Sequence, residues 1–263
     1  MENRPQSAGV QSVDRAMSLL EILAEHETGC RLTDLAMLAK LSLSTTHRLL
    51  TTLEKRRFVE FNRQETLWHI GRQSFAVGST FVRERNFVTA AMPYLRQLRD
   101  TSRETANLGV IVDGEVVFLT QVESREIMRA ITRVGGRAPM VCSGMGKAIL
   151  AAYSGSDVMA ITKRYGLRQV TPNSITRHAD LVTDLEAARA AGYAVDNEEF
   201  VAGLRCIASV VYNHLAEPIC AISISGLSSR ISLDRIPPLG EQVRGAANGM
   251  TAAIGGTIPS KVA

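Results

Sequence analysis

Hydrophobic positions near the start of the chain follow helical spacing. Residues 12–25 predict an amphipathic first helix, which the turn-forming HETGC ends. Its predicted inward stripe is Val13, Ala16, Met17, Leu20 and Leu23. A second, short helix, TDLAMLAKL, follows with Thr33 as its N-cap, and a third begins at Ser42 or Ser44 after a turn of only a few residues.

The third helix, STTHRLLTTLEKR, has two different faces. Its inward stripe at spacing i, i+3, i+4, i+7 is Thr46, Leu49, Leu50 and Leu53, whereas its outward face is small, polar and cationic. A short helix, a tight turn and such a second helix indicate a helix-turn-helix, whose last helix enters the DNA major groove. The runs FVEF and LWHI around the polar turn NRQET then predict a hairpin, or wing, with Trp68 packed beneath it.

Charge supports nucleic-acid binding only in combination with this architecture. Residues 40–72 hold seven cations against three anions, a local excess of +4 that equals the net charge of the whole chain. Charge alone fits a solvated helix face equally well. The candidate DNA contacts are Ser44, Thr45, Thr46, His47, Arg48, Thr51 and Arg63, so Thr46 is assigned both to the inward stripe and to this set. The alternative is a helix-turn-helix that makes protein contacts only.

The pattern changes to alternating strands after the wing. Residues 74–87 predict a connecting helix, and TANLGVIV and EVVFLTQVE flank an Asp113-Gly114 turn as a β-hairpin. Two or three helices follow, then the strands YAVDNEE, RCIASVVYN and PICAISISG, and a last helix over 238–255. This order predicts an α+β fold with a mainly antiparallel sheet. We therefore expect a winged helix-turn-helix domain at 1–73, a linker helix at 74–87 and a ligand-binding domain at 88–263.

The stretch CSGMGKAIL, residues 142–150, resembles a phosphate-binding loop but lacks its required residues. A Walker loop needs glycine where Val141 stands and serine or threonine where Ala148 stands, and a dinucleotide fingerprint needs a third glycine. What remains is a glycine-rich turn at a helix start, whose exposed N–H groups suit a carboxylate. A plain helix start with tight packing is the alternative.

Two serines of the last strand also suit a carboxylate. Ser223 and Ser225 are two residues apart, so both hydroxyls face the same side of the strand. They could equally be ordinary serines on a solvated face. A hydrolase or transferase with Cys206 as nucleophile, His214 as base and Asp196 as orienter is disfavoured, because about 27 Å of regular strand separates Cys206 from His214 at roughly 3.4 Å per residue.

The sequence resembles the IclR family of bacterial transcriptional regulators. The resemblance lies in QSVDRAMSLLEILAE, STTHRLLTTLE, Gly71, SGMGKA, GYAVDNEEFVAGLRCIA and CAISISG. It implies a GAF-like effector-binding domain whose pocket residues are Gly144, Met145, Asp196, Cys206, Ser223 and Ser225, with Asp196 accepting from a hydroxyl or hydrated aldehyde of the ligand. The chain departs from the family at Met145, commonly alanine, which changes the pocket volume, and at Arg57, commonly glycine.

These observations predict a regulator, expected to be a repressor, rather than an enzyme. Its expected partners are double-stranded operator DNA and a small carboxylate, semialdehyde or hydroxy acid, with no metal and no cofactor. Symmetric operators require at least a homodimer, and the family suggests a tetramer formed as a dimer of dimers. No stretch of 18 apolar residues and no signal-peptide pattern occur, so we expect a cytoplasmic protein without membrane contact.

Overall fold

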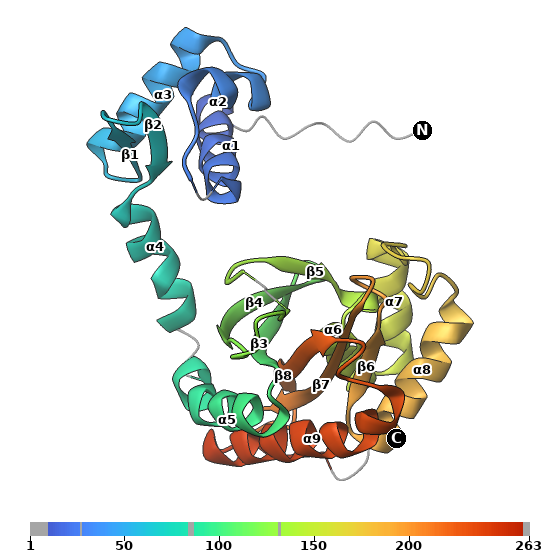
Figure 1. Ribbon diagram of the computed structural model, residues 1–263. Coiled ribbons are helices and arrows are strands. Elements are labelled where there is room, and N and C mark those ends of the chain that lie inside the picture. The colour runs from blue at the N-terminus through green and yellow to red at the C-terminus, as the bar shows by residue number, and fades with distance from the viewer. Residues whose placement is uncertain (1–9, 27, 84–86, 131–132, 260–263) are drawn as a thin grey trace, which may run out of the picture. The chain divides into compact units, whose positions relative to one another are not determined.

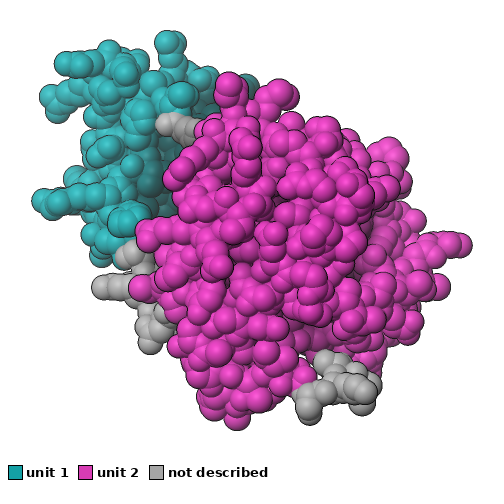
Figure 2. All heavy atoms as spheres, turned by 60° about the horizontal axis from the view of Figure 1, so that its bottom comes forward, with its two compact units in different colours: residues 1–84 teal, residues 85–263 magenta. Residues whose placement is uncertain are grey.

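The computed structural model describes residues 10–26, 28–83, 87–130 and 133–259. The chain divides into two compact units, residues 1–84 and 85–263, which Figure 2 colours separately. The first is mainly helical with a small hairpin, and the second combines a sheet with helices, which confirms the predicted α+β class. No helix among the described residues is long and apolar enough to cross a membrane.

The first unit contains the predicted winged helix-turn-helix (Figure 1). Its elements are α1 (Gln11–Glu25), α2 (Leu32–Leu38), α3 (Leu43–Lys55), β1 (Val59–Asn62), β2 (Leu67–Ile70) and α4 (Arg72–Arg83). Strands β1 and β2 pair antiparallel with Phe61 opposite Trp68. Trp68 is buried and its ring lies 4.9 Å from that of Phe61, so its assignment to packing beneath the wing is confirmed.

The predicted inward stripe of α1 is partly wrong. Val13 and Met17 are 54% and 48% exposed, whereas Leu19 is fully buried and Leu23 nearly so. The stripe that packs on the core is Ala16, Leu19, Leu20 and Leu23, which begins at Ala16 and keeps the spacing i, i+3, i+4, i+7. Both stripes have helical spacing, and the packing of α1 against α2, α3 and β2 decides which one is covered.

The helix starts follow the prediction at α3 and not at α2. Ser42 caps α3, because its Oγ accepts from the backbone N of Thr45 at 3.2 Å. The expected Thr33 cap is wrong, since α2 already begins at Leu32 and the Thr33 hydroxyl donates to Asp34 instead. Arg31 holds the N-cap position of α2 without a side-chain bond.

The second unit is built on an antiparallel sheet with strand order β5-β4-β3-β8-β7-β6. The strands are β3 (Thr105–Val112), β4 (Glu115–Val122), β5 (Arg137–Pro139), β6 (Ala194–Asn197), β7 (Leu204–Tyr212) and β8 (Pro218–Leu227). The α-helices are α5 (Phe87–Ser102), α6 (Gly144–Ala151), α7 (Gly155–Tyr165), α8 (His178–Ala191) and α9 (Ile236–Ala253), with short 3-10 turns at Met140–Cys142 and Leu233–Arg235. This arrangement confirms the mainly antiparallel sheet.

Each face of this sheet has its own apolar core. Helices α5 and α9 lie side by side and cover one face, where Leu108, Ile222 and Val243 are buried (Figure 1). Helices α6 and α8 pack on the opposite face, where Ile149 and Leu185 are buried. On β8, the isoleucines face the first core, so Ser223 and Ser225 must face the α6 side.

Candidate functional site

The outward face of α3 presents most of the predicted DNA contacts. Ser44, His47 and Arg48 are exposed, Thr45 and Thr51 are half-buried, and Arg63 is exposed in the turn of the wing. Thr46 is wrong as a DNA contact, because it is fully buried and its hydroxyl donates to the carbonyl of Ser42 at 3.0 Å. Its place in the inward stripe is therefore the correct one.

A groove beside α3 adds residues that the sequence did not indicate. It is lined by Ser12, Arg15, Thr45, His47, Arg48, Leu49, Thr51, Thr52 and Lys55. Ser12 and Arg15 come from α1, which lies beside α3 in the folded unit. Exposed cations above a groove of small hydroxyls suit a phosphate backbone, since Lys and Arg side chains neutralise phosphates. Helical periodicity shows that Arg15 lies outside the apolar stripe of α1, but it cannot show that Arg15 lies beside α3.

The second unit contains a cavity of about 110 Å³ in which predicted residues from distant segments meet. Gly144, Met145, Asp196, Cys206 and Ser225 all line it. Phe118, Ala130, Ala138, Ser143, Phe200, Val201, Leu204 and Arg205 complete the wall. Ser223 does not line the cavity and is fully buried beside it. The alternative of a solvated serine face is therefore wrong.

Strand register explains why these side chains converge. Asp196 pairs with Cys206, Cys206 with Ser225, and Ser225 with Thr105, so one row of residues crosses four strands. The neighbouring row, two residues along each strand, is Ala194, Ala208, Ser223, Asn107 and Gln121. Alternate residues on one strand face the same side, so both rows lie on the α6 side of the sheet.

The two glycines of the SGMG turn bring the start of α6 close to its neighbours. A Cβ on Gly144 would lie 3.0 Å from the Sγ of Cys206, and one on Gly146 would lie 2.0 Å from the carbonyl oxygen of Met140. Ser143 caps the helix by accepting from the N of Gly146. The first N–H groups of a helix have no partner within it, so α6 directs positive potential toward the cavity wall.

Met145 uses space that another glycine provides. Its side chain is buried, and a Cβ added to Gly109 on β3 would lie 3.0 Å from the Cε of Met145. Met145 therefore packs across β3 while also lining the cavity. Ala130 and Ala138, two small residues, form part of the same wall.

Lys147 is a buried structural residue. Its side chain is fully buried, with Nζ 2.5 Å from Oε1 of Glu199 and 3.0 Å from Oδ2 of Asp184. Burial opposes its charge, but the two carboxylates outweigh this effect, so the pKa of Lys147 is raised. The lysine is therefore committed to holding α6 against α8 and the segment after β6.

The carboxyl group of Asp196 has a pKa close to neutral pH. Burial raises its pKa to about 7, although its Oδ1 accepts from the backbone N of Glu199 at 2.7 Å and from that of Phe200 at 3.3 Å. Near neutral pH a large fraction of this side chain is therefore protonated. A protonated carboxyl can donate a hydrogen bond to a ligand oxygen, in addition to the acceptor role inferred from the sequence.

Cys206 has the properties of a neutral wall residue. Burial and the nearby Asp196 raise the pKa of its thiol to about 11, although donation from Ser225, Ser223 and the backbone of Gly144 opposes this. A thiol with this pKa is almost entirely protonated at neutral pH, and the thiolate is the nucleophilic form. His214 lies beyond Tyr212, the last residue of β7, far along the strand from Cys206.

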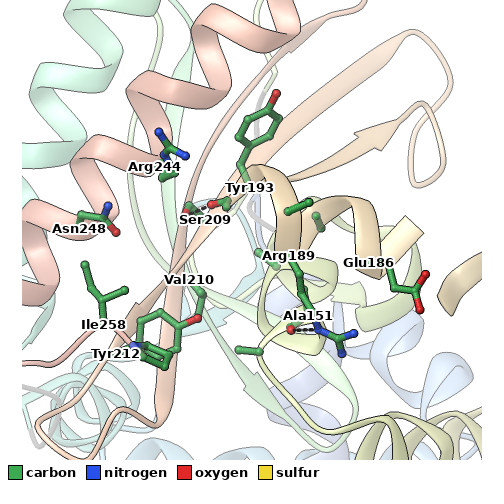
Figure 3. A pocket seen from close by; sticks show the side chains of 16 residues that line it. Ala151, Glu186, Arg189, Tyr193, Ser209, Val210, Tyr212, Arg244, Asn248 and Ile258 are labelled. Carbon is green, nitrogen blue, oxygen red and sulfur yellow. Dashed lines mark hydrogen bonds between the residues drawn. The ribbon is translucent and has the colours of Figure 1, made fainter. Parts of the chain in front are cut away.

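A larger groove, of about 610 Å³, lies on another part of the second unit (Figure 3). Arg189 donates to the Ala151 carbonyl at 2.6 Å, as Figure 3 shows, and to that of Tyr153 at 3.0 Å. Ser209 donates to the carbonyl of Gly192. Because these polar groups already pair with the backbone, the smaller cavity is the better candidate for ligand binding.

Together these features define a winged helix-turn-helix DNA-binding protein with a separate small-ligand domain. The family model for the IclR helix-turn-helix domain matches residues 12–63, and that for the bacterial transcriptional regulator IclR C-terminal matches residues 79–252. The chain belongs to the IclR family of bacterial transcriptional regulators. This family membership confirms the predicted fold and the predicted function as a DNA-binding, effector-controlled regulator.

Similarity to individual proteins extends over nearly the whole chain. The acetate operon repressor of Salmonella typhimurium is 41% identical over 255 residues, which cover 96% of this chain and 93% of that protein. The transcriptional repressor IclR of Escherichia coli is 41% identical over 254 residues, with the same shares. The structure of an IclR homologue from Microbacterium hydrocarbonoxydans, complexed with 4-hydroxybenzoate, is 24% identical with a TM-score of 0.80, covering 92% of this chain and 98% of that one.

Proposed function

We propose that this regulator is a repressor whose affinity for its operator is set by a carboxylic acid of two to four carbons bound beside α6. The single observation that carries the proposal is the cavity where Gly144, Met145, Asp196, Cys206 and Ser225 meet. The related acetate operon repressor and IclR of E. coli support the sign of regulation.

The size of the cavity supports a small ligand. Its volume is about 110 Å³, which is small beside the roughly 300–1,000 Å³ of pockets for drug-sized ligands, and this size supports acids of two to four carbons. Glyoxylate, pyruvate and a four-carbon semialdehyde fall in this range. The 4-hydroxybenzoate of the Microbacterium homologue is larger, and Met145 is one residue that narrows the site here.

The ligand carboxylate is proposed to bind neutral donors rather than a cation. The first backbone N–H groups of α6, at Gly144 and Met145, and the hydroxyl of Ser225 face it, while Asp196 and Cys206 contact the rest of the ligand. Arg205 also lines the cavity, but its guanidinium donates to Asn197, Ser228 and Ile231. Ser223 is proposed to act from behind Ser225.

DNA binding is proposed to reside in residues 1–73, with residues 74–87 as the connection and 88–263 as the effector domain. The proposed contacts are Ser44, Thr45, His47, Arg48, Thr51 and Arg63, together with Arg15 of α1. Because coupling between two binding sites is reciprocal, operator DNA weakens effector binding by the same factor as the effector weakens DNA binding, typically about 5- to 150-fold.

A homodimer is proposed as the smallest active form, because a palindromic operator needs two recognition helices. Exposed apolar side chains of the first unit support a protein contact there: Val10, Val13 and Met17 at the spacing i, i+3, i+7, and Phe75 on α4, which is 79% exposed. Pairing of dimers into tetramers is proposed from the family. A regulator of bacterial transcription acts in the cytoplasm, which is the proposed location.

The testing experiment is an anisotropy titration of the protein against its own upstream DNA, with and without glyoxylate, pyruvate and succinate semialdehyde. We expect specific binding that one acid releases. The affinity should also fall with salt by about 0.9 log unit per phosphate contact for each log unit of salt. Binding without such a salt dependence would favour a helix-turn-helix that contacts protein only. Turnover of an ester or amide that Cys206→Ala abolishes would instead show an enzyme.

A further inference from the structure

Asn107 is a buried polar residue that no sequence motif indicated. It lies on β3, where its register partners are Gln121 on β4 and Ser223 on β8. Its side chain is fully buried, on the same face of the sheet as the two serines of β8. A buried amide on this face requires hydrogen-bond partners, because an unpaired buried donor or acceptor loses its hydration without compensation.

Its partners are the two serines. Nδ2 of Asn107 lies 3.2 Å from Oγ of Ser225 and 3.4 Å from Oγ of Ser223. An amide NH₂ group has two hydrogens and accepts none, so it donates one hydrogen to each serine. Each hydroxyl that accepts in this way has only its own hydrogen left to donate, and that hydrogen must point away from Asn107.

We propose that Asn107 is a positioning residue for the effector: its amide donates to Ser225 and to Ser223 behind it, which directs the Ser225 hydroxyl hydrogen toward the ligand and makes the site selective for an acceptor such as a carboxylate. The inference rests on the proposed function of this cavity. Ser225 lines the cavity beside its register partner Cys206, and Ser223 is buried behind it. The Ser225 hydroxyl thus faces the place where the carboxylate is proposed to lie.

The physical gain comes from orientation. An isolated serine hydroxyl rotates and can donate or accept, so it binds a carboxylate and an amide NH₂ with similar ease. A hydroxyl that accepts from Asn107 has one of its two acceptor positions filled and its hydrogen directed away from Asn107, which favours donation toward the ligand without reorientation. The site therefore discriminates against a ligand that presents N–H groups in place of the carboxylate oxygens.

The oxygen of the same amide supports a role beyond core packing. Oδ1 of Asn107 is buried and has no hydrogen-bond partner among the described residues, and the same is true of Oε1 of its register partner Gln121. A core amide selected for stability alone would have both ends paired. The donor end of this amide is instead paired with the serines, while its oxygen has no partner among the described residues.

The test replaces the donor of Asn107 with an acceptor of the same shape. In Asn107→Asp, the serines donate to the new carboxylate and turn their hydrogens away from the ligand. The probes are pyruvate and pyruvamide, or glyoxylate and its amide if glyoxylate binds better, measured by titration calorimetry. We expect the wild-type preference for the acid to fall by about tenfold in this variant, because an acceptor now faces the serines. A purely structural defect would weaken both ligands equally and leave their ratio unchanged.

Gln121→Glu is the matched control, because it places the same new charge at the register partner without touching the serines. We expect this control to change the ratio of acid affinity to amide affinity by less than about threefold, which is the size of a modest through-space charge effect. Operator binding and thermal unfolding check that each variant is folded. Where Asn107→Asp does not fold, Asn107→Thr replaces it, since a single hydroxyl can donate to only one serine and should reduce the ratio by about threefold.

Two negative results are distinguishable. A wild-type protein that binds none of the two- to four-carbon acids removes the proposed effector class, and the role of Asn107 with it. A wild-type protein that binds pyruvate or glyoxylate, with an unchanged ratio in the Asn107 variants or an equal loss in Gln121→Glu, leaves the effector site in place and refutes the positioning role alone.

Discussion

The two candidate binding surfaces of this protein present opposite kinds of polar group. The groove proposed to face DNA is lined by three cations on flexible side chains: Arg48 and Lys55, which are exposed, and the half-buried Arg15. The proposed effector cavity is lined mainly by groups without a permanent charge, among them Cys206 with a pKa of about 11 and Asp196 with a pKa of about 7. Long-range electrostatic attraction speeds the association of a polyanion such as DNA. Fixed, uncharged donors instead make a site specific for the shape and polarity of a small ligand.

The largest expected effect concerns the scaffold of the effector cavity. Lys147→Met should lower the stability of the second unit by about 3–5 kcal/mol, because Glu199 is left buried without its cation. The single tryptophan, Trp68, lies in the first unit, so its fluorescence reports that unit, while far-UV circular dichroism reports the whole chain. In a denaturant titration, only the dichroism transition should shift. Equal shifts of both signals would contradict independent units.

The serines should separate the two surfaces most cleanly. Ser223→Ala with Ser225→Ala should reduce affinity for the effector acid by about 1.5–3 kcal/mol for each charged hydrogen bond lost. Operator affinity measured without ligand should stay within the error of the wild-type value, because neither serine lies in the first unit. A double variant that is still released from DNA by the same acid concentration would remove both serines from the site.

Substitution of Arg48 should have the opposite effect, loss of operator binding with effector binding kept. Arg48→Ala should weaken operator binding by about 1–3 kcal/mol if the guanidinium reads a base, or should reduce the salt slope by about 1 if it contacts a phosphate. Effector affinity should be unchanged. Thr46→Val is the matched control on the same helix, because Thr46 is buried and should affect DNA binding only through stability. Normal operator affinity and salt slope in Arg48→Ala would contradict the proposed orientation of α3.

Effector binding should depend on pH, and the sign follows from Asp196. Its folded-state pKa is raised by burial to about 7, so its carboxylate repels an ionised ligand above that pH and is protonated below it. Affinity for pyruvate should therefore rise by about tenfold between pH 8 and pH 6, as the protonated fraction increases. Calorimetry at both pH values measures this, and Asp196→Asn should give a flat profile. A flat profile in the wild-type protein would exclude the protonated role of Asp196.

The smallest expected effect concerns the left-handed backbone conformation of Arg57 in the first unit. Arg57 has φ of 63°, where the resemblance to the family implies glycine, and its carbonyl lies 2.5 Å from where a Cβ on Gly71 would stand. Arg57→Gly should stabilise the first unit by about 1 kcal/mol, because glycine adopts this conformation without steric cost. Trp68 fluorescence during denaturation would show the gain. A stability loss would mean that the exposed arginine side chain contributes more than its backbone costs.

Local patterns determined the elements and most of the side chains on the outward face of α3. Period and turn chemistry suffice where one helix decides which side chains face outward, as in the stripe of Thr46, Leu50 and Leu53 on α3. The same rule failed at Val13 and Met17, because two neighbouring stripes of α1 are both apolar and the covering partner comes from elsewhere in the chain. Sequence spacing alone could not choose between them.

The effector site was only partly accessible from the sequence. Family resemblance indicated Asp196, Cys206 and the serines, and strand alternation placed the two serines on one side. The register of β3 against β8 is a tertiary property, and it alone brings Asn107 to both serines. The raised pKa of Asp196 and the buried pairing of Lys147 likewise arise from burial, which depends on segments separated by tens of residues. The sequence by itself therefore determined which side chains can donate hydrogen bonds. The packing of the sheet decided in which direction those hydrogen bonds point.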